Sequence, residues 1–405
     1  MTLPETELLK QLVRTASVNP AFTTDGTGGE GPITDFLQGL LEDLGIQWLR
    51  QTVMPGRDNL VALLPGDPAD VMLWEVHQDT VGIAGMTIDP FGGEERDGRI
   101  WGRGACDIKG GMAAMLTALA RAQAVEDRQG PTIVLGMSIN EECGFTGAAA
   151  LSRLWSCDES IRIDPATVTG SLTVEQLRRL RPQRAIVAEP TMLDVVVAHR
   201  GVVRWKCHTH GLAAHSSQPE RGRNAIYAMS EVARAIEDFH LEQLCRYEPH
   251  ARCGKPTACV SMIEGGSGVN TVPDHAVIDI DRRLIPGETP EAAYELLTAY
   301  INERVQREGI QVEHEQPWIG TQGLGDENNQ AWAERIAGVV RGMDLPSELV
   351  GVPYGTDAPA IVAEDIPTVV FGPGSIDQAH TKDEWLAVEQ LQWATEVLFR
   401  LACGG

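Results

Sequence analysis

Short apolar runs typical of buried strands alternate with longer helical segments along most of this chain, and this alternation constrains the fold more than any other feature. Strands that alternate with helices form βαβ units, in which the strands join one sheet and the helices cover its faces. We therefore expect an α/β domain with a mixed central sheet flanked by helices. The clearest strand candidates are Asn59–Leu64, Val71–Val76, Thr132–Ile139, Ala185–Ala188 and Pro367–Phe371, and the clearest helices are Lys109–Ala124 and Val388–Ala402.

The middle of the chain has a different pattern. Its expected elements follow the order βαββαβ, which is typical of a ferredoxin-like α+β domain. A chain of 405 residues is also too long for one ordinary domain. We expect a larger domain formed by residues 1–200 and 316–405, with residues 201–315 inserted as a second domain. The elements behind this expectation are Val202–His208, Asn224–Phe239, Cys259–Ile263, His275–Asp281, Pro290–Arg307 and Ile310–Glu313.

Composition excludes several classes of function. The chain has 57 acidic and 33 basic residues, a formal charge of −24, which repels phosphate backbones and anionic membranes. Because of this charge, we expect no nucleic-acid partner and no membrane partner. In addition, no apolar stretch approaches the ~18 residues that a membrane span needs. The start of the chain has no basic segment followed by an apolar run, and the eight cysteines include no CxxC pair. These features favour a cytoplasmic enzyme with reduced thiols.

Polar side chains suited to metal binding come at the ends of two expected strands. His77 and Asp79 come at the end of one strand, where residues two apart point to the same face, so the carboxylate can orient the imidazole. Glu141 and Glu142 follow the next strand, a place where α/β sheets position ligands and catalysts. Adjacent carboxylates point in different directions. One of them can therefore bind a cation while the other transfers a proton.

Three further residues complete a candidate metal site. Asp107 lies in a glycine-dense turn before a helix, whereas Glu189 and His380 each follow an expected strand. Taken singly, such residues have ordinary explanations, for example a helix N-cap for Asp107. Together, the two imidazoles and three carboxylates of the set suit two zinc-like ions that share one carboxylate. The charges also balance, because two divalent ions offset three carboxylates and one hydroxide.

These motifs resemble those of the M20 family of metallopeptidases and amidohydrolases, in particular the branch with acetylornithine deacetylase and succinyl-diaminopimelate desuccinylase. The resemblance covers nearly the whole chain. It implies that Asp107 bridges two divalent metal ions, that His77 and Glu189 complete one site, and that Glu142 and His380 complete the other. Zinc is the expected metal, and cobalt or manganese would accept the same ligands.

The resemblance also implies roles for residues that do not bind metal. Asp79 would orient the neighbouring imidazole, and Glu141 would be the general base. His215, in the inserted domain, would donate a hydrogen bond to the developing oxyanion in a neighbouring active site. Asn270 and Arg283 would bind the substrate, with the guanidinium gripping an α-carboxylate. The alternative for Arg283 is a surface salt bridge on a sheet.

Two other histidine-containing patterns have simpler interpretations. His208 and His210 form an HxH pair on an expected strand, and we interpret both as residues of a solvated face. Ser216 and Ser217 stand beside His215, but no strand–turn–helix elbow surrounds them, which argues against a serine nucleophile.

The function that the resemblance implies is hydrolysis of the amide bond of a small N-acylated amino acid by a zinc-dependent amidohydrolase. An acetylornithine deacetylase-like deacylase is expected first. A succinyl-diaminopimelate desuccinylase, or a dipeptidase or carboxypeptidase of the same family, is the alternative. The family also implies a homodimer through the inserted domain. A metal-free scaffold would have lost some of the metal ligands, but all five are present in the sequence. A dinucleotide-dependent oxidoreductase would need a GxGxxG motif after its first strand, and the sequence has none there. Both alternatives are therefore disfavoured.

Overall fold

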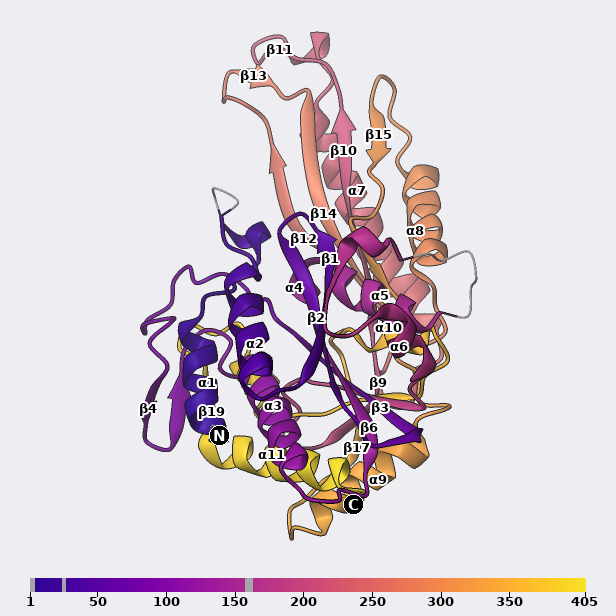
Figure 1. The fold of residues 1–405 in the computed structure, drawn as a ribbon. Coiled ribbons are helices and arrows are strands. Elements are labelled where there is room, and N and C mark those ends of the chain that lie inside the picture. Colours follow the sequence, from indigo (N-terminus) through magenta and orange to yellow (C-terminus); the bar gives the residue numbers. More distant parts are fainter. Residues whose placement is uncertain (1–3, 24–26, 157–162) are drawn as a thin grey trace. The chain divides into compact units, whose positions relative to one another are not determined.

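The computed structural model describes residues 4–23, 27–156 and 163–405, and it divides into two compact units (Figure 1). Unit 1 is discontinuous in the sequence, because the chain leaves it after Val197 and returns to it at Asp326. Unit 2 is the segment between these points with a short addition. The units comprise Met1–Val197, Asp326–Val350 and Thr356–Gly405 (unit 1), and Ala198–Gly325 and Gly351–Gly355 (unit 2).

The centre of unit 1 is a nine-stranded mixed sheet, which confirms the fold class expected from the sequence. The pairs β3–β6, β3–β8 and β8–β18 are parallel, whereas β1–β2, β2–β6, β1–β7 and β9–β18 are antiparallel. In spatial order, the strands are β17 (Leu349–Val352), β9 (Val195–His199), β18 (Thr368–Val370), β8 (Arg184–Val187), β3 (Asp67–His77), β6 (Pro131–Ser138), β2 (Arg57–Leu64), β1 (Gln47–Met54) and β7 (Val168–Gly170).

Helices cover both faces of this sheet (Figure 1). Five of them share one large hydrophobic core with the sheet: α1 (Glu5–Arg14), α2 (Gly31–Asp43), α3 (Lys109–Gln123), α9 (Gln330–Arg341) and α11 (Val388–Ala402). The others are short: α4 (Glu141–Gly144), α5 (Thr146–Ser152), α6 (Val174–Arg179) and α10 (Ala358–Val362). A small separate sheet in the order β19-β5-β4 consists of Trp385–Ala387, Arg99–Trp101 and Glu94–Arg96.

Helix α3 is buried on nearly all sides, because it packs between the sheet, α1 and α11. Its first turn contains Gly110 and Gly111, and these glycines let neighbouring groups come close. A Cβ atom at Gly110 would lie 2.3 Å from Leu386 Cδ2 and 2.7 Å from the carbonyl oxygen of Ala105. The glycines therefore allow the close packing that fixes the start of this helix.

We expect Gly110→Ala to lower the free energy of unfolding by roughly 1–3 kcal/mol, because the added methyl group overlaps a backbone oxygen that has little room to move. Gly39 in α2 is the matched control. A Cβ there meets nothing within 4 Å, so Gly39→Ala should raise stability by up to about 1 kcal/mol. Denaturant midpoints measure both effects. Equal midpoints for the two variants would contradict the packing argument.

Unit 2 contains a five-stranded antiparallel sheet, in which β12-β14-β10-β15 are neighbours in this order and β16 also pairs with β10, with α7 and α8 on one face. This strand order is that of the ferredoxin-like fold, as the βαββαβ pattern predicts. The elements are β10 (Gly201–His210), α7 (Ala225–Asp238), β12 (Thr257–Gly265), β14 (His275–Leu284), α8 (Pro290–Arg304) and β15 (Gln311–His314), with β16 (Ile319–Thr321) also paired to β10 and a small two-stranded sheet of β11 (Ala214–His215) and β13 (Thr271–Val272).

Within the three described stretches of the chain, no helix is long and apolar enough to cross a membrane.

Candidate metal centre

Four strands of unit 1 end at the same edge of the sheet. Strands β18, β8, β3 and β6 are neighbours and run parallel to one another. The carboxyl ends of parallel strands meet at one edge, so residues that follow different strands come together there. The side chains gathered in this way are His77, Glu141, Glu142, Glu189 and His380, and Asp107 joins them from the turn before α3.

These side chains form two groups that share one aspartate. His77, Asp107 and Glu189 each place one potential ligand atom within 4.8 Å of the others, and so do Asp107, Glu142 and His380. The two oxygens of Asp107 face different histidines. Oδ1 lies 3.3 Å from His77 Nε2, and Oδ2 lies 3.3 Å from His380 Nε2. His380 Nε2 is also 3.2 Å from Glu142 Oε2.

This donor set fits two divalent metal ions. In a tetrahedral zinc site with bonds of about 2.0–2.2 Å, ligand atoms lie about 3.3–3.6 Å apart, which is close to the spacing seen here. His77 Nε2 is buried without a hydrogen bond although Asp107 is 3.3 Å away, and Glu142 Oε1 is likewise buried without a hydrogen bond. Such buried atoms are costly unless something binds them.

The charges of the cluster also favour cations. Burial raises the pKa of Glu142 to about 7, with the negative charge of Asp107 adding to the effect. Burial and the same aspartate raise the pKa of Glu189 well above its usual value. Hydrogen bonds to Asp107 and Glu142 raise the pKa of His380 to about 10. Without metal, Glu142, Glu189 and His380 therefore hold protons more tightly than usual. Divalent ions bound at these side chains would displace such protons.

The backbone carbonyl and the carboxylate of Asp79 form hydrogen bonds with different residues of the centre. Its carbonyl oxygen accepts a hydrogen bond from His77 Nδ1 at 3.0 Å, whereas its carboxylate is 3.6 Å from that nitrogen. A carbonyl can only accept, so Nδ1 carries the proton and Nε2 offers its lone pair. The carboxylate accepts from the backbone N–H groups of Glu141 and Glu142, at 3.0 and 3.2 Å. It therefore also holds the glutamate pair in place.

Glu141 belongs to neither three-residue group. It is buried at the start of α4, beside Glu142 and next to the left-handed residue Asn140. Burial raises the pKa of Glu141 well above its usual value, and the charges of Glu189 and Glu142 raise it further. A carboxyl group with a raised pKa that does not bind metal is suited to accepting and returning a proton.

The sequence did not suggest Glu384, which holds the loop of Asp107. Its buried carboxylate accepts from the backbone N–H groups of Gly104, Cys106 and Asp107, each at 2.9 Å, and pairs with Arg103 at 2.7 Å. The pairing of β19 with β5 brings Glu384 to this loop from 277 residues away. A single acidic residue before a short strand carries no local signal of this role.

We expect Glu384→Gln to lower the free energy of unfolding by about 3–5 kcal/mol, because it leaves the buried Arg103 guanidinium without its charged partner. The variant should also bind metal more weakly, since the backbone at Asp107 loses its anchor. Thermal unfolding and metal content after dialysis measure the two effects. Glu389→Gln, at an exposed position of α11, is the control and should match the wild type. A Glu384 variant as stable as this control would refute the anchoring role.

The remaining candidate residues lie in unit 2. His215 is exposed on β11, and the backbone carbonyl of Asn270 accepts from the N–H of Ser216 at 3.0 Å, so the structure brings His215 and Asn270 close together. Strand β14 begins at His275, five residues after Asn270. Arg283 lies near the other end of this strand, roughly 27 Å from His275 along it. Its Nε donates to Asp281 Oδ1 at 2.7 Å, which is the surface ion pair considered as the alternative for this residue.

The chain is similar to known hydrolases over nearly its full length. The family model described as peptidase family M20/M25/M40 matches residues 73–403. Acetylornithine deacetylase from Myxococcus xanthus is 30% identical over 385 residues, which cover 92% of this chain and 93% of that protein.

Solved structures share the same fold. The M20 family metallo-carboxypeptidase Sso-CP2 from Sulfolobus solfataricus has a TM-score of 0.76 at 15% identity, with both chains fully covered. The YXEP protein of Bacillus subtilis, named a dinuclear metal binding peptidase from the M20 family, has a TM-score of 0.65 at 16% identity, with 98% of this chain and 96% of that chain covered. Because the family model spans most of the sequence, the chain belongs to peptidase family M20/M25/M40, a family of hydrolases.

Proposed function

We propose that the protein is a di-metal amidohydrolase that removes the acyl group from a small N-acylated amino acid. In this proposal, Asp107 bridges the two ions, His77 and Glu189 complete one site, and Glu142 and His380 complete the other. The observation that carries the proposal is the position of Asp107, whose two carboxylate oxygens each lie 3.3 Å from a different histidine. Two imidazoles with three carboxylates favour zinc, and cobalt or manganese are the alternatives.

The residues around the centre support a hydrolytic mechanism. When bound, the two ions would polarise the amide carbonyl and lower the pKa of the attacking water. Glu141 takes a proton from that water and returns it to the departing amine, which its raised pKa allows. Asp79 keeps His77 in the tautomer with Nε2 free and holds the backbone of Glu141. His215, from unit 2, would donate a hydrogen bond to the oxyanion.

The proposed substrate is N-acetylornithine or a close relative of it. The support is the set of curated relatives named acetylornithine deacetylase, which are about 30% identical over more than nine-tenths of the chain. Asn270 and Arg283 are the proposed substrate-binding residues, with Arg283 released from its pairing to Asp281 when it grips a carboxylate. We place the reaction in the cytoplasm, in line with the absence of a CxxC pair from the sequence.

We further propose a homodimer through unit 2. Strand β12 is an edge strand of the unit 2 sheet, and an edge strand exposes unpaired backbone groups to another chain. Met262 and Ile263 on this strand are 58% and 60% exposed, and Tyr227 on the adjoining helix α7 is 62% exposed. A second copy of the same edge would cover these apolar side chains. In such a dimer, His215 would reach the neighbouring active site.

Amine release by the zinc- or cobalt-loaded protein tests the function. N-acetylornithine should be hydrolysed fastest among N-acetyl amino acids, N-succinyl-diaminopimelate and dipeptides, and a chelator should abolish the activity because the carbonyl and the water lose their activating ions. Adding the metal back should restore turnover. Chelator-sensitive cleavage of a different member of the panel would reassign the substrate, whereas turnover that survives metal removal would refute the di-metal mechanism.

A further inference from the structure

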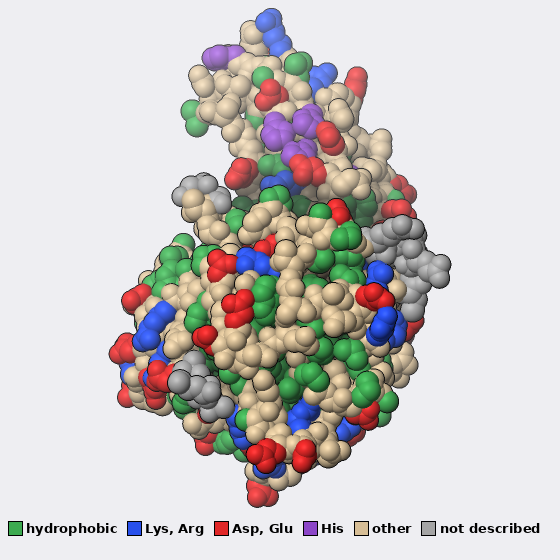
Figure 2. Space-filling view, in the orientation of Figure 1, with side chains coloured by type: hydrophobic (Ala, Val, Ile, Leu, Met, Phe, Trp, Pro, Cys, Tyr) green, Lys and Arg blue, Asp and Glu red, His purple; other side chains and the backbone are tan. Residues whose placement is uncertain are grey.

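A second group of potential metal ligands lies on the helix-free face of the unit 2 sheet. Helices α7 and α8 cover the other face, where residues such as Trp205 and Ile278 are buried in the core of this unit. Because side chains alternate along a strand, the residues between these core positions face away from the helices. Figure 2 shows histidine side chains gathered on this surface. They are His208 and His210 of β10 and His275 of β14.

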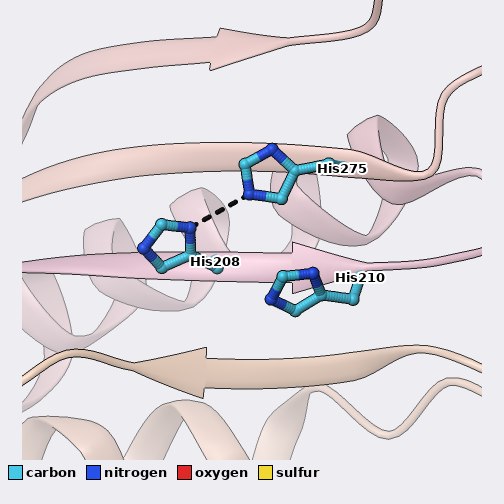
Figure 3. Close-up of side chains that lie close together, drawn as sticks. All are labelled: His208, His210 and His275. Atoms are coloured by element: carbon cyan, nitrogen blue, oxygen red, sulfur yellow. Dashed lines mark hydrogen bonds between the residues drawn. The ribbon is translucent and has the colours of Figure 1, made fainter.

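Strand register brings the three histidines together. His210 pairs directly with His275 across the β10–β14 ladder, and His208 lies two residues before His210 on the same face. The ring centroids are 5.2–5.9 Å apart, and one nitrogen from each ring lies within 4.8 Å of the others. The closest pair is His208 Nδ1 and His275 Nε2, at 3.0 Å (Figure 3). One nitrogen of each of the three imidazoles thus lies in one small volume.

Glu315 fixes the orientation of His208. Its Oε1 lies 2.8 Å from His208 Nε2, and because a carboxylate accepts, Nε2 carries the proton. His208 Nδ1 is then the lone-pair nitrogen, so the proton in the 3.0 Å contact belongs to His275 Nε2. A metal ion would replace that one proton. A histidine that donates to a carboxylate while its other nitrogen faces a metal is the usual arrangement of outer-shell support in metal sites.

A second carboxylate stands beside the third imidazole. His210 Nε2 is buried and 3.2 Å from Glu313 Oε2, but the two atoms do not form a hydrogen bond. Glu313 and Glu315 add acidic side chains to this part of the surface, next to the three imidazoles. From the sequence, His208 and His210 were expected to be residues of a solvated face. The carboxylates of Glu313 and Glu315 beside the grouped imidazoles favour a cation-binding site instead.

We propose that His208, His210 and His275 bind a third divalent metal ion, with Glu315 as the residue that positions His208. Three imidazoles with an open position for water suit Zn²⁺, and imidazole also suits copper and nickel. All of the residues belong to unit 2, and the proposal is independent of the function proposed for unit 1. The bound ion would link β10 to β14 in the sheet.

Metal content tests this proposal with Zn²⁺ as the probe. After loading with Zn²⁺ and dialysis, the wild type should hold one equivalent more per chain than His275→Ala. Gln311→Ala is the control, because Gln311 pairs with His210 on the same face but is not among the three ligands, and it should keep the full content. The same one-equivalent difference should persist in an Asp107→Asn background. Loss of metal from the unit 1 centre therefore cannot be mistaken for loss of metal from the three histidines.

Two further measurements sharpen the test. Glu315→Gln should weaken the affinity of this ion 10- to 100-fold in competition with a chromogenic chelator, because it removes the charged partner of His208. Crystals grown with Zn²⁺ should show anomalous density at the zinc edge between the three rings. Equal zinc content in wild type and His275→Ala, or an ion that binds there only at millimolar concentration, would overturn the proposal.

Discussion

Glu141→Gln should reduce turnover by about 10²–10⁴-fold while the protein keeps the metal content of the wild type. The substitution removes the group that accepts and returns the proton, and general acid–base catalysis contributes an effect of this size. It leaves the two groups of potential ligands intact, since Glu141 belongs to neither of them. Steady-state kinetics on the preferred substrate and elemental analysis of the same sample give the two readouts.

The adjacent residue provides the matched control for this variant. Glu142→Gln changes the same functional group one position along the chain, but Glu142 lies 3.2 Å from His380 and belongs to a three-residue group. It should lose one metal ion as well as activity. If Glu141→Gln also lost metal, or if it retained wild-type turnover, the assignment of Glu141 as the base would be wrong.

Asp107→Asn should abolish the binding of both ions and reduce activity to the background level. Only this residue is shared by the two groups, and the amide replaces one of its two acceptor oxygens with a donor. Replacement of an outer-shell partner weakens metal affinity 10- to 100-fold, and the loss of a charged bridging ligand should exceed that for both ions. Elemental analysis after dialysis should find two metal ions per chain fewer than in the wild type.

The fold should survive this substitution, which separates metal loss from unfolding. The hydrogen bond from the backbone N–H of Asp107 to Glu384 does not involve the side chain and remains possible in the variant. Circular dichroism and thermal unfolding check this point. Asp97→Asn is the control, because Asp97 is exposed in a left-handed turn that asparagine also tolerates. An Asp107 variant that holds as many metal ions per chain as the wild type would contradict the bridging role.

The sequence determined the architecture of both units. The expected strand Thr132–Ile139 is β6, Pro131–Ser138, and the expected helix Lys109–Ala124 is α3, Lys109–Gln123. The βαββαβ pattern of the inserted segment correctly predicted the ferredoxin-like strand order. These features are local, because hydrophobic periodicity within ten or fifteen residues reflects which face of an element is buried. The positions of the candidate metal ligands after strands followed from the same local patterns.

Only the tertiary structure showed which distant residues support these sites. The three-stranded sheet of β4, β5 and β19 brings Glu384 to the loop of Asp107, and its strands are three residues each, too short to show a period in the sequence. The carboxylate of Asp79 holds the backbone of Glu141 and Glu142, a contact that depends on the alignment of β3 with β6.

The three histidines of unit 2 are likewise brought together only by the tertiary structure. The sequence showed His208 and His210 as an isolated pair, because His275 lies 65 residues after His210 and has no local pattern that links it to them. The register of β10 against β14 places His275 opposite His210. The sequence thus determined which elements form and which faces they bury, since these depend on local periodicity. Strand register and the packing of distant segments determined which polar side chains meet, because those contacts form only when the whole core is assembled.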